Sequence, residues 1–511
     1  MNTFMNGLVD NTNYTYTENG GITHKTTKSD LMDLFALGGA YRSRSDADVI
    51  NLFKNAYEED PLYALKCLFY LRDILCGQGE RRFFRVALNW LAKTDPEAVR
   101  RNVQYIPMFG RYDDLYCLVD TPVEVDAFSF ITHQLALDVQ SKTPSLLAKW
   151  LKSENTSSKE SRKLATKTRK YLGMTSRQYR KTLSTLRERI NVLERLMSAG
   201  QWDKIEFDKI PSQAGMRYRN AFARHDVERM RMATTDSLQS YEDFAKDTTK
   251  KVNAKALAPY ECVREVVKKM EWHYLRGTTM EISETERNMI NKYWDNLTDY
   301  FQNATLNGIC VVDTSGSMTH RSTSVSPIDV AISLGLYCAE HNSGPFANHY
   351  ISFASRPQLI RTDGVDFCDK VFRIYKTNLV DTTNIEAVFD LLLNTAMQPG
   401  VKKEDIPKNV IIISDMEFDS ARGYGWKRYA SDIETTMETI MRRWEEAGLE
   451  APNLVFWNVD ARQNNIPMQM KHGVTFVSGF SPATFEMLMS GKTAQDLVYE
   501  KLNSERYSVI K

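Results

Sequence analysis

The sequence predicts a multidomain protein in which an N-terminal region of α-helices precedes a C-terminal α/β domain. Up to about residue 304, apolar residues recur mainly at helical spacing and runs of strand-forming residues are few. Beyond residue 305, short apolar runs rich in β-branched residues alternate with helical stretches. That alternation is typical of a mostly parallel sheet covered by helices on both faces.

The predicted organisation has four parts. Residues 1–25 are rich in Asn, Thr and Gly and have no apolar period, so we expect a flexible arm. Residues 26–304 form the helical scaffold, and residues 305–490 form the α/β domain. Residues 491–511 are a C-terminal tail or a closing segment.

Helix starts and breaks divide the scaffold into short helices. Asp60-Pro61 and Asp95-Pro96 each begin an apolar-periodic run, as expected for helices that start at proline. Gly77 and Gly79 break the first run, and a helix resumes over Arg81–Leu91. Helices separated by short breaks predict stacked helical hairpins, a degenerate repeat of the HEAT-like kind.

Residues Thr175–Ala199 predict the clearest single helix of the scaffold. Apolar side chains recur there at alternating steps of four and three, which makes one stripe along a helix. The stripe consists of Tyr179, Leu183, Leu186, Ile190, Leu193 and Met197.

Charge is segregated along the chain, although the totals of 66 basic and 65 acidic residues nearly cancel. Residues 141–231 hold 22 Lys or Arg and 9 Asp or Glu, a net charge of +13, which leaves −12 for the remainder. This excess favours a binding face over charges that are merely solvated. A basic face could also meet an acidic protein or the chain's own acidic part.

The seven cysteines are widely spaced and include no C-x-x-C pair, which argues against disulfides and structural zinc. The N-terminus lacks the charged-then-apolar order of a signal peptide. No apolar stretch reaches the ~18 residues that cross a bilayer. We therefore expect a cytoplasmic protein (in the host cytoplasm if it is viral) with no membrane partner.

The α/β domain is predicted from five strand-like runs and the helices between them. The expected strands are Gly308–Val312, His349–Phe353, Asn409–Ser414, Asn453–Asn458 and Val474–Ser478. The expected helices are Pro327–Glu340, Ile385–Met397 and Ser431–Ala447.

Three loops of this domain carry oxygen ligands at the ends of predicted strands, where α/β sheets place their functional loops. They contain Asp313-Thr-Ser315-Gly-Ser317, Thr382-Thr383-Asn384 and Ser414-Asp415. Alternate residues of an extended loop project to one side, so Asp313, Ser315 and Ser317 can converge. Hydroxyls and carboxylates suit a hard cation such as Mg²⁺, or else Mn²⁺ or Ca²⁺.

This D-x-S-x-S arrangement resembles the metal-ion-dependent adhesion site of von Willebrand factor A domains, which are Rossmann-like. The resemblance implies that Ser315, Ser317 and Thr383 bind the metal directly. It also implies that Asp313 and Asp415 act directly or through water. Thr383 is preferred to Thr382 because of its offset from the following helix.

The wider sequence resembles a family of eukaryotic and viral proteins in which a helical region precedes a von Willebrand factor A domain. The segments that carry this likeness are Asp60–Lys66, Trp202–Ile205, Pro211-Ser212, His225-Asp226, Ser414–Asp419, Phe456–Asn458 and Val477–Phe480. A more distant resemblance is to the Ro autoantigen and its TROVE module. There a ring of helical repeats is closed by an A domain and binds RNA, so it implies an RNA partner that is single-stranded or a structured non-coding RNA.

Basic residues of the 141–231 region are the candidate RNA contacts, because cations neutralise phosphates while interspersed Tyr171 and Tyr179 offer stacking surfaces. The candidates are Lys163, Lys167, Arg169, Lys170, Arg177, Arg180 and Lys181. The leading hypothesis is a Ro-like RNA-binding protein that scaffolds a ribonucleoprotein. The alternative is an adaptor whose A-domain cation captures an acidic partner residue. No catalytic constellation is present, so we do not expect an enzyme.

Overall fold

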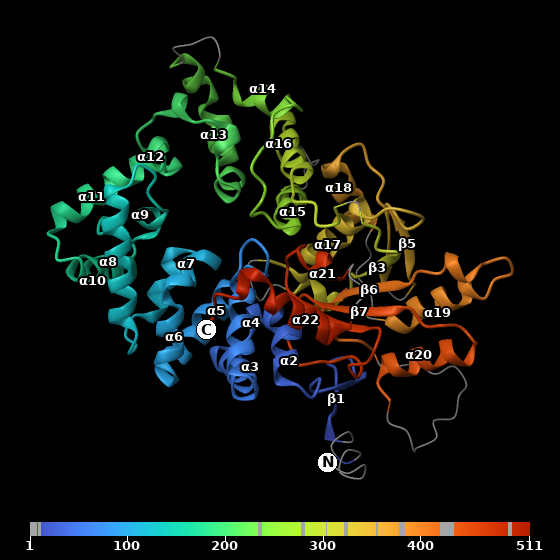
Figure 1. Cartoon of the computed structure of the whole chain (residues 1–511). Coiled ribbons are helices and arrows are strands. Elements are labelled where there is room, and N and C mark those ends of the chain that lie inside the picture. Colours follow the sequence, from blue (N-terminus) through green and yellow to red (C-terminus); the bar gives the residue numbers. More distant parts are fainter. Residues whose placement is uncertain are drawn as a thin grey trace.

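A computed structural model of the chain describes residues 8, 12–232, 238–276, 282–302, 304–320, 325–353, 356–377, 384–419, 434–488 and 493–511. Figure 1 shows a helical region that leads into a domain built on one sheet. In the described part of the chain the change from helices to sheet comes at Gly308. The predicted combination of an α region and an α/β domain is confirmed.

The helical region runs from residue 30 to residue 295. Its helices are α2 (Asp30–Leu37), α3 (Asp46–Glu59), α4 (Pro61–Arg72), α5 (Arg81–Thr94), α6 (Pro96–Asn102), α7 (Ile106–Phe109), α8 (Glu124–Gln140), α9 (Leu147–Trp150), α10 (Lys159–Tyr171), α11 (Ser176–Arg189), α12 (Leu193–Ser198), α13 (Ser212–Arg231), α14 (Tyr241–Lys246), α15 (Pro259–Arg276) and α16 (Glu284–Asp295). Short 3₁₀ helices connect several of them, including η1 (Gly38–Ser43) and η3 (Tyr112–Leu118).

The predicted proline starts are confirmed. The carboxylate of Asp60 accepts a hydrogen bond from the Tyr63 backbone N–H (3.0 Å) and caps α4, with Pro61 at the first helical position. Asp95 caps α6 in the same way. Each cap satisfies a backbone donor that the first turn of a helix leaves free.

The prediction of one helix over Thr175–Ala199 is wrong. Helix α11 ends at Arg189, and α12 begins only at Leu193. Asn191 adopts a left-handed conformation (φ +48°) between them, one that Asn tolerates better than most residues. The apolar stripe still reaches the core, since Tyr179, Leu183, Leu186 and Leu193 are buried.

The sheet has six strands in the order β5-β4-β3-β6-β7-β8. All neighbouring pairs are parallel except β4 and β5, which are antiparallel. The strands are β3 (Gly308–Asp313), β4 (His349–Phe353), β5 (Gln358–Arg361), β6 (Asn409–Ser414), β7 (Asn453–Asn458) and β8 (Val474–Ser478). The five predicted strands are confirmed, four with unchanged bounds, and the exposed edge strand β5 is an addition.

Helices pack around this sheet. They are α17 (Pro327–His341), α18 (Phe367–Thr377), α19 (Ile385–Ala396), α20 (Thr436–Glu446), α21 (Thr484–Leu488) and α22 (Ala494–Asn503). Helix α17 packs on β3, β4 and β6, while α2 of the helical region packs on β7 and β8. The central strands β3 and β6 are buried almost throughout, as expected for a sheet covered on both faces.

The helical region forms a closed circuit, because both of its ends pack on the sheet domain (Figure 1). At one end α2 contacts β8, and at the other α15 contacts α17 and α18. The two ends also meet at Phe480, which follows β8. The Arg42 guanidinium lies 3.7 Å from the centroid of the Phe480 ring, and the Tyr260 ring lies 5.3 Å from it.

The expectation of a flexible arm over residues 1–25 is wrong for its second half. Residues Tyr14–Tyr16 (β1) and Ile22–His24 (β2) pair as an antiparallel hairpin. Isolated bridges join Gly20 to Asp419 and His24 to Ile466, so the hairpin is bound to the sheet domain. Its residues are mostly polar, and backbone and side-chain hydrogen bonds rather than an apolar stripe hold it there.

The C-terminal segment returns to the helical region. Helix α22 packs against α4, and the short helix η8 (Glu505–Tyr507) follows it. The buried carboxylate of Asp73 accepts hydrogen bonds from the Arg506 guanidinium (Nη2, 2.7 Å) and from the Tyr507 hydroxyl (2.9 Å). The end of the chain therefore ties the sheet domain to the first helices.

We predict that Asp73→Asn lowers the free energy of unfolding by about 2 kcal/mol, because Arg506 loses its charged partner. The same change will speed tryptic cleavage after Arg506. Urea unfolding followed by circular dichroism and timed proteolysis measure the two effects. Glu58→Gln, in the exposed pair with Lys54, is the matched control and will leave both unchanged. Equal urea midpoints for Asp73→Asn and the unsubstituted protein would contradict the role given to this tie.

Candidate functional site

The candidate cation site lies where the strand order of the sheet reverses. From β3 the chain moves to β4 on one side, and it later returns to β6 on the other side of β3. In open α/β sheets the crevice at such a switch point, outside the carboxyl ends of the strands, is where ligands bind. Asp313 ends β3 and Ser414 ends β6, so both predicted loops open onto this point.

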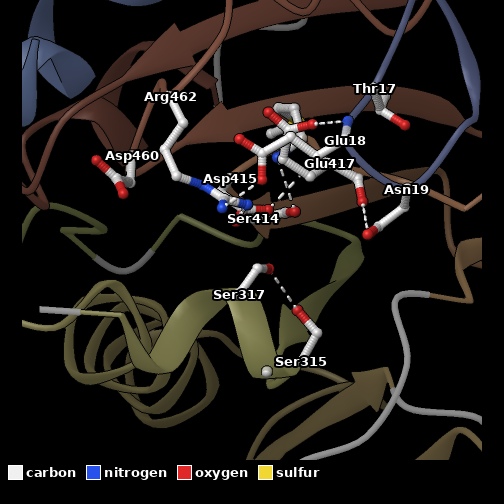
Figure 2. Close-up of polar contacts among 12 residues, drawn as sticks. Thr17, Glu18, Asn19, Ser315, Ser317, Ser414, Asp415, Glu417, Asp460 and Arg462 are labelled. Carbon is white, nitrogen blue, oxygen red and sulfur yellow. Dashed lines mark hydrogen bonds and ion pairs between the residues drawn. The ribbon is translucent and has the colours of Figure 1, made fainter.

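The first loop brings its hydroxyls together. The Oγ atoms of Ser315 and Ser317 lie 3.0 Å apart (Figure 2). Asp313 fixes the loop, because its carboxylate accepts hydrogen bonds from the Ser315 backbone N–H (2.9 Å) and from the Ser414 hydroxyl (2.5 Å). The chain then turns into the 3₁₀ helix Gly316–Thr319. The predicted convergence of these three residues is present.

The loop after β6 turns sharply at Met416, which has φ +64°, an uncommon conformation for a residue with a side chain. The Ser414 hydroxyl accepts a hydrogen bond from the Met416 N–H (3.0 Å), and the Asp415 carboxylate accepts one from the Glu417 N–H (3.2 Å). Burial raises the pKa of this carboxylate, and Ser317 lies near enough to it to act in the opposite direction, so the two loops approach each other at Asp415.

Arg462 was not predicted as part of the site. Its Nη2 lies 2.9 Å from the Asp415 carboxylate, and its Nη1 lies 2.5 Å from Glu18 of the N-terminal hairpin. Figure 2 shows its guanidinium beside Asp415, while the Asp460 carboxylate lies apart from it. Asp460 and Arg462 directly follow β7, the strand next to β6, and this Asp-x-Arg pattern was the available sequence signal.

Several buried carboxyl groups share this one guanidinium. Burial and the charge of Asp415 raise the pKa of Asp313 to about 7. Burial also raises the pKa of Glu417 to about 7, and the charge of Asp415 adds to that effect. Burial raises the pKa of Asp415 and of Asp460 despite the opposing charge of Arg462. The site therefore holds more potential negative charge than its arginine offsets.

This donor set fits a hard divalent cation. The two serine hydroxyls and the carboxylates of Asp313 and Asp415 are oxygen ligands of the type Mg²⁺ prefers. One oxygen each of Glu417 and Asp460 is buried with no hydrogen-bond partner among the described residues. Among the described residues, no group of three His, Cys, Asp or Glu side chains is placed to hold a metal ion. Thr383, the predicted fifth ligand, and Thr382 lie outside the described residues.

The N-terminal hairpin lies against this site, as Figure 2 shows. The Thr17 hydroxyl donates to the Phe418 carbonyl (2.6 Å), and the Glu18 N–H donates to the Glu417 carboxylate (2.7 Å). The Asn19 side chain donates to the Glu417 carbonyl (2.5 Å). Residues that the sequence placed in a flexible arm thus support the loop after β6.

The predicted RNA contacts lie on α10 and α11, and two of the seven are engaged inside the chain. Lys167 pairs with Asp120 (2.8 Å) and Glu124 (2.6 Å), and Arg169 pairs with Glu154 (2.8 Å). Their ion pairs make these two less available to phosphate than the rest. The other five side chains are exposed and have no ion pair with a described residue: Lys163, Lys170, Arg177, Arg180 and Lys181. We call these five the α10–α11 basic face.

The two tyrosines proposed as stacking surfaces are also engaged. Tyr179 is buried, and its hydroxyl donates to the Lys152 carbonyl (2.7 Å). Tyr171 stacks on Phe128 with 4.2 Å between ring centroids, and its hydroxyl donates to Glu124 (2.7 Å). The basic face therefore offers cations more than free aromatic rings.

None of the helices in the described part of the chain has both the length and the apolar character that crossing a bilayer requires.

Three comparisons with known proteins show what this chain is similar to. Residues 17–121 and 132–305 match the family described as Domain of unknown function (DUF2828), and residues 307–508 match Domain of unknown function (DUF7788). The uncharacterized protein L728 of Acanthamoeba polyphaga mimivirus is 30% identical over 519 residues, which cover 94% of this chain and 85% of the relative. The crystal structure of the Deinococcus radiodurans RO (RSR) protein is similar with a TM-score of 0.47 and 14% identity, covering 91% of this chain and 99% of that one. The DUF2828 match spans more than half of the sequence and the viral relative nearly all of it, so the chain belongs to the DUF2828 family.

Proposed function

We propose that this protein is a non-catalytic RNA-binding scaffold that holds RNA on its α10–α11 basic face. The observation that carries the proposal is that the five cations of this face stay exposed and without an ion pair among the described residues. The chain as a whole carries a net charge of only +1, so the cations gathered here are a local excess. Such an excess attracts a polyanion through counterion release.

The spacing of the α11 cations supports contact with consecutive phosphates. Arg177, Arg180 and Lys181 lie three and four residues apart, so they project from neighbouring positions on one side of the helix. The buried stripe of Tyr179, Leu183 and Leu186 holds the opposite side. The helix therefore presents its charges on a surface that its own packing fixes.

We predict that replacing Arg177, Arg180 and Lys181 together by Glu abolishes binding of a labelled single-stranded RNA in fluorescence anisotropy. Loss of three phosphate contacts will also lower the slope of log affinity against log salt by about 2. The control carries Lys402→Glu, Lys403→Glu and Lys408→Glu, the same charge change on exposed residues of the sheet domain. Unchanged RNA affinity in the α11 variant would remove the proposal.

A second proposal concerns the switch-point site: that it binds one divalent cation and, through it, an acidic group of a protein partner. The observation that favours it is the meeting of Ser315, Ser317 and Asp415 beside Asp313. These four residues would hold the ion. When bound, the ion supplies a positive charge that attracts a carboxylate of the partner.

We predict that MgCl₂ or MnCl₂ at about 100 times the dissociation constant stabilises the protein by about 2.7 kcal/mol. Asp313→Ala will remove this response, because the loop loses both a ligand and the acceptor that fixes Ser315 and Ser414. Thermal unfolding with and without the metal measures it, and Asp363→Ala, an exposed carboxylate outside the site, is the control.

The partner is tested separately, by pull-down from cell extract. Proteins captured with Mg²⁺ should be lost with a chelator and with Asp313→Ala. Recovery of the same proteins under all three conditions would show that the site does not recruit a partner through a cation.

A further inference from the structure

A second group of cations surrounds two buried carboxylates at the start of η3. Asp113 and Asp114 have side chains that are 5% and 0% exposed. The cations around them come from separate parts of the chain: Arg72 at the end of α4, Arg81 and Arg85 in the first turns of α5, Arg111 before η3, and Lys152 after α9. We call Arg81, Arg85, Arg111 and Lys152 the η3 basic cluster.

Pairing inside this group is incomplete. Asp114 is bound by Arg72 (2.8 Å) and Arg85 (2.6 Å). Asp113 accepts two hydrogen bonds from Arg111 (2.8 and 2.6 Å) and lies 3.1 Å from Arg85. Lys152 lies 3.6 Å from the same carboxylate. Two carboxylates therefore face five cations, and a surplus of positive charge remains.

Of the five cations, Arg81 is the least neutralised. No hydrogen bond or ion pair joins its guanidinium to a described residue, and it lies one helical turn from Arg85 in α5. Burial and the charges of Arg111 and Arg85 lower the pKa of Arg81, and the charges of Asp113 and Asp114 oppose this. Like charges that act on one another repel, and an anion would offset that cost.

The cations that form ion pairs with Asp113 are held in fixed orientations. Asp113 binds Nε and Nη2 of Arg111, which leaves Nη1 with no partner in the described part of the chain. Burial would raise the pKa of Asp113, but Arg111, Arg85 and Lys152 outweigh it and hold that pKa at about 2. The carboxylate therefore stays charged and keeps the Arg111 guanidinium oriented.

An aromatic ring lies within the cluster. The Arg111 guanidinium carbon is 3.9 Å from the centroid of the Trp150 ring, and Lys149 Nζ is 5.6 Å from it. Stacking on Trp150 fixes the plane of Arg111 and leaves its edge as the donor surface. Planar, oriented guanidinium groups are well matched to phosphate oxygens.

The cluster adjoins the α10–α11 basic face. The Lys152 carbonyl accepts the hydrogen bond of Tyr179, a buried residue of α11. Two residues further on, Glu154 pairs with Arg169 of α10 and accepts a hydrogen bond from Ser176 of α11 (2.6 Å). The segment that carries Lys152 is thus bonded to both helices of the basic face.

We infer that the η3 basic cluster binds a phosphate group of RNA, with Arg81, Arg111 and Lys152 as its donors. The inference rests on the proposed RNA-binding function and adds a second contact outside the α10–α11 basic face. The continuity with that face and the presence of Trp150 favour RNA over a phosphopeptide as the source of the phosphate.

Arg81→Glu is the test variant, because Arg81 has no partner to lose within the described residues. In the free protein a Glu at this position faces Arg85 and Arg111, so the melting temperature should stay equal or rise. Affinity for a labelled single-stranded RNA should nevertheless fall about tenfold or more, and the log–log salt slope by about 1. Lys93→Glu, an exposed cation in the last turn of the same helix, is the matched control and should keep the affinity of the unsubstituted protein.

The outcomes separate this inference from the proposed function. If Arg81→Glu binds RNA as well as Lys93→Glu does, while the α11 triple variant does not bind, the inference is overturned and the proposed function stands. If the unsubstituted protein binds no RNA, both fail. Inorganic phosphate is the second probe. A melting-temperature rise with phosphate that depends on Arg81, without an Arg81-dependent loss of RNA affinity, would assign the cluster to a free phosphate and overturn the RNA assignment.

Discussion

The attachment of both ends of the helical region to one sheet is the constraint on which the rest of the structure depends. Around Phe480, after the last strand, Arg42 from the first helices and Tyr260 from α15 pack on one ring. A partly buried ion pair between Arg42 and Glu80 holds the first of these in place. Pairing offsets the cost of taking the Arg42 charge out of water, so this junction fixes both partners together. The helices between them are then held in a closed circuit.

Acidic and basic side chains collect in different parts of the fold. The carboxyl ends of β3, β6 and β7 gather Asp313, Asp415 and Asp460 at one point, because parallel strands all end at the same edge of the sheet. Cations gather instead on α10, α11 and the start of η3, in the part of the circuit formed by residues 81–181. The proposed cation site and the proposed RNA-binding surfaces therefore lie in different parts of the fold.

Much of the sheet domain could be predicted from sequence, because its strands are buried on both faces and read as continuous apolar runs. Strand β5 was not predicted, because Gln358–Arg361 is a short, mostly exposed edge strand without a continuous apolar run. The hairpin of residues 14–24 was not predicted because backbone and side-chain hydrogen bonds to residues far away in the sequence hold it in place. The approach of Ser315 and Ser317 beside Asp313 could be predicted from local spacing, and Asp415 was expected nearby because it follows a second parallel strand. Arg462 was missed, because the Asp-x-Arg pattern meets Asp415 only when β7 lies beside β6.

The tie between Asp73 and the last residues of the chain has a consequence for biosynthesis. The two partners are separated by 433 positions, so the first helices leave the ribosome long before Arg506 exists. Contacts between such distant parts of a chain form late, since the entropy of closing the loop must be overcome first. Until Arg506 and Tyr507 have been made, the Asp73 carboxylate lacks both of these partners. The tie between the sheet domain and the first helices can therefore form only after the helical region and the whole sheet have been synthesised.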